Sequence, residues 1–126
     1  MMMKINNKRI RRILKEIIQS IHKNASYGWI SDKVKYPYVT YEYEMRYSGN
    51  KGIGTLEINV WDLSESTEQV EDIADNLENG LNELIYNDEH TILKFYTSSR
   101  LAILDDNKDI KRRRLLFEMQ YYPGRE

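Results

Sequence analysis

A long amphipathic helix in the middle of the chain is the feature that most constrains the fold. Ser66, followed three residues later by Gln69, has the form of a capping box and predicts where this helix begins. Beyond it, apolar residues recur every three or four positions and would share one face of the helix: Val70, Ile73, Ala74, Leu77, Leu81, Leu84 and Ile85. A helix with one apolar stripe must bury that stripe against a second layer of structure.

A second amphipathic helix is predicted for residues 5–23. Its apolar stripe again has helical spacing, and basic residues occupy the opposite face. The stripe consists of Ile10, Ile13, Leu14, Ile17, Ile18 and Ile21. Two helices of this kind can cover the same face of a sheet.

The rest of the chain predicts that sheet. Apolar residues alternate along residues 39–47 and 56–60, and the glycine-containing turn at 48–52 joins these two strands into a hairpin. Further strands are predicted at residues 91–97, 101–104 and 115–121. A turn at 105–107 leads into the last of them. The fold class is therefore α+β, with the order α-β-β-α-β-β-β. The sheet is expected to be mainly antiparallel, to have about five strands, and to be covered by both helices on one face.

Length and composition favour a single intracellular domain spanning residues 1–126. A chain of 126 residues is long enough for one core and short for two. It contains no apolar run near the ~20 residues of a membrane span and no signal-peptide pattern. Without cysteine it has no disulfide, thiolate nucleophile or cysteine-bound metal.

No group of residues predicts catalysis. His22 and His90 lie on different predicted elements, and neither belongs to a metal-binding pattern. The glycines at 49–54 lack the Lys-Ser/Thr and the helix of a phosphate loop, and the acidic and basic residues at 105–111 are interpreted as a charged turn. We expect no catalytic residue, cofactor or metal and therefore no enzyme. A metal-dependent hydrolase with scattered carboxylates is the alternative least favoured.

Charge is strongly segregated along the chain although the net charge is only −1. Residues 1–23 contain seven basic residues and one acidic residue, whereas residues 62–89 contain ten acidic residues and neither lysine nor arginine. The candidate acidic face consists of Glu68, Glu71, Asp72, Asp75 and Glu78. The candidate basic face consists of Arg9, Arg11, Arg12, Arg112 and Arg113.

Two basic clusters, at residues 8–15 and 111–114, support an alternative function as a small nucleic-acid-binding protein. Clustered cations neutralise phosphates and release counterions. Against this, the pI is about 6.2, the central helix is acidic, and no nucleic-acid-reading motif is present. Solvated faces and charge complementarity between neighbours explain the clusters better.

Aromatic residues in and beside predicted loops suggest a protein interface. The chain has ten tyrosines and two tryptophans, and such side chains are typical of binding surfaces. The candidate interface combines loop aromatics with the tip of the first hairpin, and consists of Tyr27, Trp29, Tyr36, Tyr38, Gly49, Asn50, Lys51 and Trp61. The loop at 24–35 and the hairpin tip at 48–52 are the segments expected to contact partners.

A resemblance to a known family rests on the order of three segments. Tyr36-Pro37-Tyr38-Val39 opens a strand, a glycine-containing hairpin follows, and Ile58-Asn59-Val60-Trp61-Asp62 ends the next strand before the helix that opens at residues 64–70. This order resembles the tail terminator, or tail completion, proteins of tailed bacteriophages and prophages. The resemblance covers roughly residues 1–121.

The resemblance implies a structural protein that is made in the bacterial host cytoplasm and built into the tail or neck of the virion. Such proteins form a ring, often of six copies, at the head-proximal end of the tail and join tail to head. The implied partners are other copies of the chain, the tail tube protein and a head-completion protein, while DNA passes through without specific binding. A ring places different edges of neighbouring subunits together, so the basic first helix could meet the acidic second helix. Alternatively, the acidic helix faces the channel and repels DNA.

Overall fold

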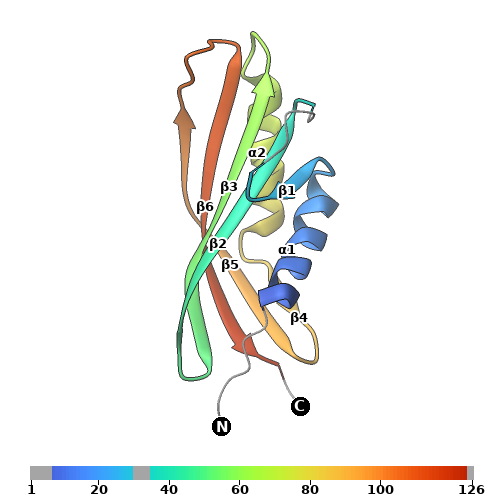
Figure 1. The fold of residues 1–126 in the computed structure, drawn as a ribbon, viewed down its shortest axis with the longest axis vertical. Coiled ribbons are helices and arrows are strands. Elements are labelled where there is room, and N and C mark those ends of the chain that lie inside the picture. Colours follow the sequence, from blue (N-terminus) through green and yellow to red (C-terminus); the bar gives the residue numbers. More distant parts are fainter. Residues whose placement is uncertain (1–6, 30–34, 125–126) are drawn as a thin grey trace.

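The computed structural model describes residues 7–29 and 35–124 (Figure 1). Within them the elements follow in the order α1 (Asn7–Ile21), β1 (Ala25–Tyr27), β2 (Tyr38–Ser48), β3 (Lys51–Leu63), α2 (Glu68–Leu81), β4 (Ile85–Asn87), β5 (Thr91–Ile103) and β6 (Ile110–Pro123). The strands form one sheet of six in the order β1-β2-β3-β6-β5-β4. Only β1 and β2 are parallel, and every other neighbouring pair is antiparallel.

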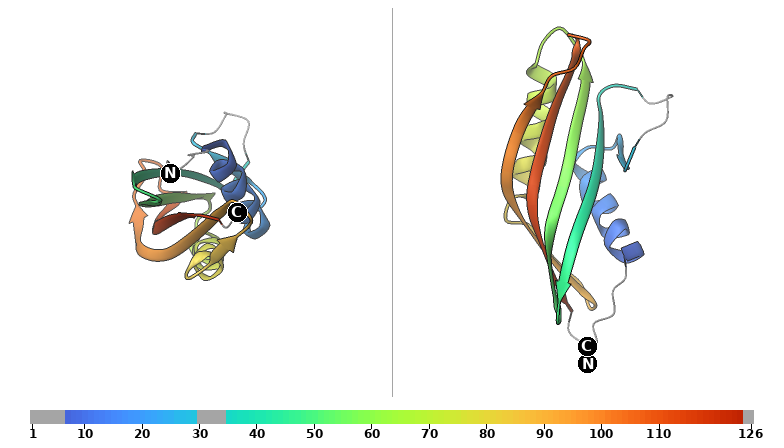
Figure 2. Two further views of the ribbon diagram at one scale, coloured as in Figure 1. Left: turned by 90° about the horizontal axis from the view of Figure 1, so that it is seen from below. Right: turned by 60° about the vertical axis from the view of Figure 1, so that its left-hand side comes forward.

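Both helices lie on one face of a long, strongly twisted sheet (Figures 1 and 2). The core fills the space between these two layers. Its largest buried side chains include Phe95 and Phe117 from the sheet and Leu14 and Leu77 from the helices. The predicted α+β class and the position of both helices on one face are therefore confirmed. Within residues 7–29 and 35–124, neither helix has the length and apolar content to cross a membrane.

The predicted number and pairing of strands are wrong in three places. β1 is only three residues long and lies in the predicted loop at 24–35, of which residues 30–34 are outside the described residues. α2 ends at Leu81, and Glu83 has φ of 64°, so the chain turns there and neither Leu84 nor Ile85 belongs to the helix; Ile85 begins β4. The strands predicted at 91–97 and 101–104 are one strand, β5, interrupted by a bulge between Thr97 and Ser99. The sheet consequently has six strands and is mixed.

The predicted capping box is also absent. Thr67 occupies the N-cap position of α2 and makes no side-chain cap hydrogen bond. The Ser66 hydroxyl instead accepts a hydrogen bond from the backbone N–H of Glu68 at 3.1 Å. The Gln69 amide donates to Oδ1 of buried Asp62 at 3.1 Å, because the end of β3 lies beside the first turn of α2.

α1 and β2 keep close to their predicted bounds, whereas β3 and β6 each begin five residues before the strands predicted at 56–60 and 115–121. α1 covers Asn7–Ile21 of the predicted 5–23, and residues 5 and 6 lie outside the described residues. The first hairpin turns at Gly49, whose φ of 60° favours glycine. Gly54 of β3 permits a close approach of strands, because a Cβ there would lie 1.9 Å from the carbonyl oxygen of Glu44.

Candidate interaction surfaces

A row of stacked side chains crosses the sheet face that points away from the helices. The register places Tyr38 of β2 beside Trp61 of β3, and Trp61 beside Arg112 of β6. The rings of Tyr38 and Trp61 are stacked, with centroids 5.8 Å apart and planes inclined by 19°. The guanidinium carbon of Arg112 lies 4.2 Å from the Trp61 ring centroid, and Tyr36 extends the row at 5.1 Å from Tyr38. We call these four residues the aromatic row.

Hydrogen bonds fix the aromatic row in place. Arg112 donates from Nε and Nη2 to Oδ1 of Asn59, at 3.1 and 3.0 Å. The Asn59 amide in turn donates to Oε2 of Glu57 at 3.0 Å. Trp61 donates from Nε1 to the Thr40 hydroxyl at 3.3 Å. Because these side chains are already held, a partner binding here would lose little conformational entropy in ordering them.

A shallow pocket of about 340 Å³ lies between the aromatic row and the chain at Gly28 and Trp29. Trp29 is 87% exposed. Burial lowers the pKa of Arg112 and raises the pKa of Tyr38. Arginine is nevertheless charged in proteins, so the pocket combines aromatic walls with a fixed cation. Fixed arginines and aromatics of this kind are typical of protein interfaces.

The other candidate interface residues lie elsewhere. Tyr27 faces the helix side of the sheet, where its ring packs edge-on against Tyr41 at 5.5 Å and beneath the guanidinium of Arg11 at 3.9 Å. The hairpin tip of Gly49, Asn50 and Lys51 lies at the far end of β2 and β3 (Figure 1). The structure thus brings together Trp29, Tyr36, Tyr38 and Trp61 but neither Tyr27 nor the hairpin tip.

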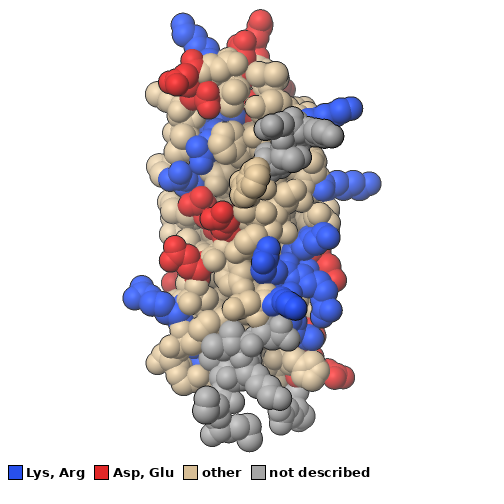
Figure 3. Space-filling model, viewed as in Figure 1, with Lys and Arg blue, Asp and Glu red and all other residues tan. Residues whose placement is uncertain are grey.

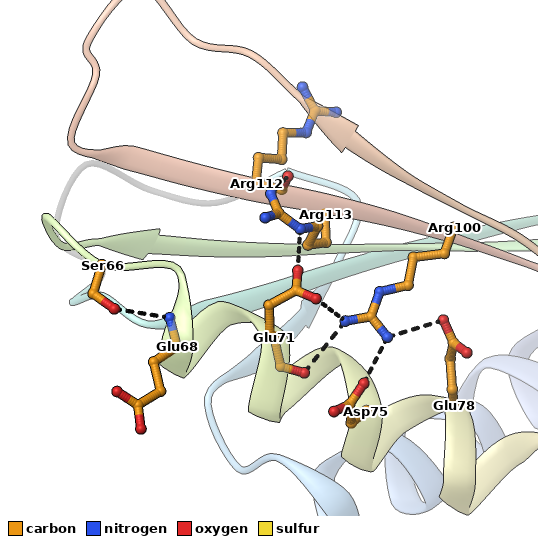
Figure 4. A network of polar contacts seen from close by, with 8 residues as sticks. All are labelled: Ser66, Glu68, Glu71, Asp75, Glu78, Arg100, Arg112 and Arg113. Carbon is orange, nitrogen blue, oxygen red and sulfur yellow. Dashed lines mark hydrogen bonds and ion pairs between the residues drawn. The ribbon is translucent and has the colours of Figure 1, made fainter.

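Part of the candidate acidic face is neutralised by a strand arginine (Figure 4). Arg100 of β5 contacts Glu71 at 2.8 Å, Asp75 at 2.7 Å and Glu78 at 3.4 Å. Arg113 of β6 also donates to Glu71. Desolvation disfavours the charged form of Arg100, but hydrogen bonding to Asp75 and the negative charges of Glu71 and Glu78 outweigh it and raise the pKa of Arg100.

The bulge in β5 is what turns Arg100 toward α2. Before the bulge the odd-numbered Thr97 lies opposite Phe117, and after it the even-numbered Arg100 lies opposite Leu115. The extra residue therefore reverses which side chains of β5 face the helices: odd-numbered residues face them before the bulge and even-numbered residues after it. Sequence reasoning did not identify Arg100. The available signal was the spacing of Glu71, Asp75 and Glu78 on one flank of the helix, which calls for a cation from a neighbouring element.

Two residues of the candidate acidic face remain unneutralised. Glu68 and Asp72 are exposed on α2 and make no ion pair within residues 7–29 and 35–124. The acidic face is therefore divided into a flank held by Arg100 and an outer side that points into solvent.

The basic cluster at 111–114 is not one surface. Because side chains alternate along a strand, Arg112 lies in the aromatic row while Arg113 lies on the helix side. Arg114 lies 3.8 Å from Glu57, and the Lys111 ammonium donates to the carbonyl of Lys108. The four cations are therefore divided between the two faces of the sheet, and each has a contact within the chain.

The basic residues of α1 are also divided. Arg9 pairs with Asp88 at 2.6 Å and donates to the Thr91 hydroxyl at 3.2 Å, and Arg11 stacks on Tyr27. Arg12 is exposed. In Figure 3 lysine and arginine side chains gather over the α1 side of the molecule.

In the part of the chain that the structure describes, no three residues among His, Asp and Glu are placed to hold a metal ion. The pocket beside the aromatic row is open and shallow.

The sequence matches no family model, and no curated protein matches it. The fold is similar to that of a chain in the solved structure of the virion of a native gene transfer agent particle. The superposition has a TM-score of 0.63, covers 86% of this chain and 85% of that chain, and aligns residues with 14% identity. At this identity the similarity is one of fold.

Proposed function

We propose that the protein is a structural component of a phage-like virion and acts through protein–protein contacts, without catalysis. The observation that carries this proposal is the fold similarity to a gene transfer agent virion chain, which spans 86% of one chain and 85% of the other. A match over nearly the whole of both chains is what a shared building block would give. The fixed aromatic row and its open pocket are consistent with a contact role.

The specific role that we propose is that of a tail terminator or tail completion protein. Its support is the order of segments that resembles this family, which corresponds to β2, the hairpin tip, β3 and α2. In this role the chain forms a ring at the head-proximal end of the tail, between the tail tube protein and a head-completion protein. DNA passes through the ring without specific binding.

The proposal is tested on particles purified from the bacterial host. Mass spectrometry should detect the chain in intact virions, and immunogold labelling should place it at the neck. Deletion of its coding sequence should yield separate heads and tails, with tails of irregular length. Particles that lack the chain, or that assemble and infect normally after the deletion, would contradict a structural role.

Ring formation has its own test. The mass of the purified protein is measured by light scattering across a concentration series, and the same samples are imaged in negative stain. Closed rings support the terminator role. Labelling distributed along the whole tail instead of at the neck would replace it with a tail tube role.

A further inference from the structure

Two stripes of opposite charge on the helices have identical spacing. Each consists of three residues at positions i, i+4 and i+7, which lie on one face of an α-helix. All six are exposed, and they are Lys8, Arg12 and Lys15 on α1 and Glu68, Asp72 and Asp75 on α2. We call them the basic stripe and the acidic stripe.

The two stripes do not compensate each other within the molecule. The helices meet on another flank, where Ile21 of α1 lies against Gly80 of α2. No ion pair joins the basic stripe to any residue within 7–29 and 35–124. Of the acidic stripe, only Asp75 is paired, with Arg100, and its side chain remains 58% exposed. Complementary charges are therefore available to a second molecule.

Several other charged side chains of the helices have partners within the chain, which distinguishes them from the two stripes. Arg9 is paired with Asp88, and Arg11 is stacked on Tyr27. Glu71 and Glu78 are held by Arg100. Glu16 is the exposed acidic residue of α1, so the solvent side of that helix is otherwise basic or neutral.

We propose that the basic stripe of one copy docks against the acidic stripe of another copy. The proposal rests on the proposed ring function and names the contact through which neighbouring subunits join. A contact between two different patches repeats around a ring, because each subunit offers its α1 to one neighbour and its α2 to the other. Charge complementarity of this kind fixes the register of a contact and raises its association rate, and salt weakens it.

The test reverses the charges of each stripe separately and together. One variant carries Lys8→Glu and Arg12→Glu, and a second carries Glu68→Lys and Asp72→Lys. Asp75 is left unchanged because Arg100 depends on it. A third variant carries all four substitutions and keeps the native net charge, which makes it the matched control for global electrostatics. Circular dichroism and urea unfolding verify that each variant is folded.

Association is measured by sedimentation velocity at low ionic strength across a concentration series. The native chain and the fourfold variant should associate, whereas each double variant alone should associate at least about tenfold more weakly, because like charges then face each other. An equimolar mixture of the two double variants should recover association, since every contact in it is again complementary. Added salt should weaken all of these complexes.

Three outcomes would overturn the proposal. They are a monomeric native protein at every concentration, equal association of native and double variants, and a fourfold variant that fails to associate while the native chain does. A fourth outcome would overturn the proposal in favour of a different partner. If the native chain binds DNA in a salt-sensitive manner, and both variants that carry Lys8→Glu and Arg12→Glu lose this binding, the basic stripe is a nucleic-acid surface.

The interface and the proposed function fail in different experiments. Virions that contain the chain and assemble normally with both double variants would refute the interface and leave the structural role intact. If the chain associates in a charge-dependent way but is absent from virions, the structural role is refuted and the interface stands.

Discussion

The exposed cations Lys8 and Arg12 of helix α1 and the arginines of strands β5 and β6 carry the same charge, but the fold uses them in opposite ways. Arg100 and Arg113 are held by carboxylates of α2, and Arg112 lies over Trp61 and donates to Asn59. Lys8 and Arg12, by contrast, lie exposed on α1 and form no ion pair with the described residues. The strand arginines contribute to the stability of this chain, whereas Lys8 and Arg12 are available to another molecule.

Clustering along the sequence does not by itself make a charged surface. Successive residues of a strand face opposite sides of the sheet, so a run of four cations at 111–114 is divided between two environments. On a helix, residues four apart share a face, so Lys8 and Arg12 reinforce each other although three residues separate them. Four measurements test this distinction between strand and helix cations.

The largest effect is expected for Arg100→Ala. The substitution leaves Asp75 and Glu78 without a cation and Glu71 with Arg113 alone, and these side chains are partly exposed. We expect the free energy of unfolding to fall by about 1–2 kcal/mol, less than for a fully buried network because solvent screens the charges. Urea unfolding measures it, with Arg12→Ala as the matched control on the helix. Equal losses for the two variants would remove the distinction between strand and helix cations.

The ion pair of Arg9 with Asp88 should make the free energy of unfolding depend on pH in the acid range. Burial opposes ionisation of Asp88, but hydrogen bonds from the Tyr86 hydroxyl, the backbone N–H of His90 and the Arg9 guanidinium outweigh it and lower the pKa of Asp88 from 3.8 to about 2. A lowered pKa in the folded state means that the carboxylate stabilises the fold above about pH 4 and that this contribution is lost as the pH falls toward 2.

The size of that contribution is about 1–2 kcal/mol. Unfolding free energies measured between neutral pH and pH 2 should therefore fall less steeply for Asp88→Asn than for the native chain. Parallel pH profiles for the two proteins would show that Asp88 is not held as the structure describes.

A smaller effect is expected for Arg112→Lys. Lysine keeps the positive charge but loses the planar stacking on Trp61 and the two hydrogen bonds to Asn59. The free energy of unfolding should fall by about 1 kcal/mol. Arg12→Lys is the matched control and should leave it unchanged. An unaffected Arg112→Lys variant would mean that charge alone matters in the aromatic row.

The smallest effect is expected on the basic stripe itself. Lys8→Ala, Arg12→Ala and Lys15→Ala should each change the free energy of unfolding by less than about 0.5 kcal/mol, because these side chains are exposed and unpaired within the described residues. Chemical denaturation of dilute, monomeric protein is the measurement. A loss above 1 kcal/mol would place these cations among the structural ones.

Much of the architecture was predictable because it depends on periodicity. The stripe that runs from Val70 to Leu81 became α2, and the alternation at residues 39–47 and 56–60 became β2 and β3. The strand predicted at 115–121 lies within β6. Periodic burial is a local property of helices and strands, so the pattern can be recognised before the fold is known.

The candidate site was predictable only in part. Tyr38 and Trp61 were identified as interface residues, but Arg112 was assigned to a basic face, and nothing along the chain indicated that Asn59 and Glu57 would hold it. Cross-strand neighbours depend on register, and register is set by the pairing of β2, β3 and β6 over residues far apart in sequence.

Local patterns along the chain are enough to establish the two amphipathic helices, the first hairpin, the alternation of β6 and the segregation of charge. Which charges remain free, by contrast, depends on how distant segments pack together. The bulge between Thr97 and Ser99 turned Arg100 toward α2, and the short strands β1 and β4 had too few residues to show a period of their own. Free charge depends on what packs beside a side chain, and that is settled by contacts between distant segments rather than by any local pattern.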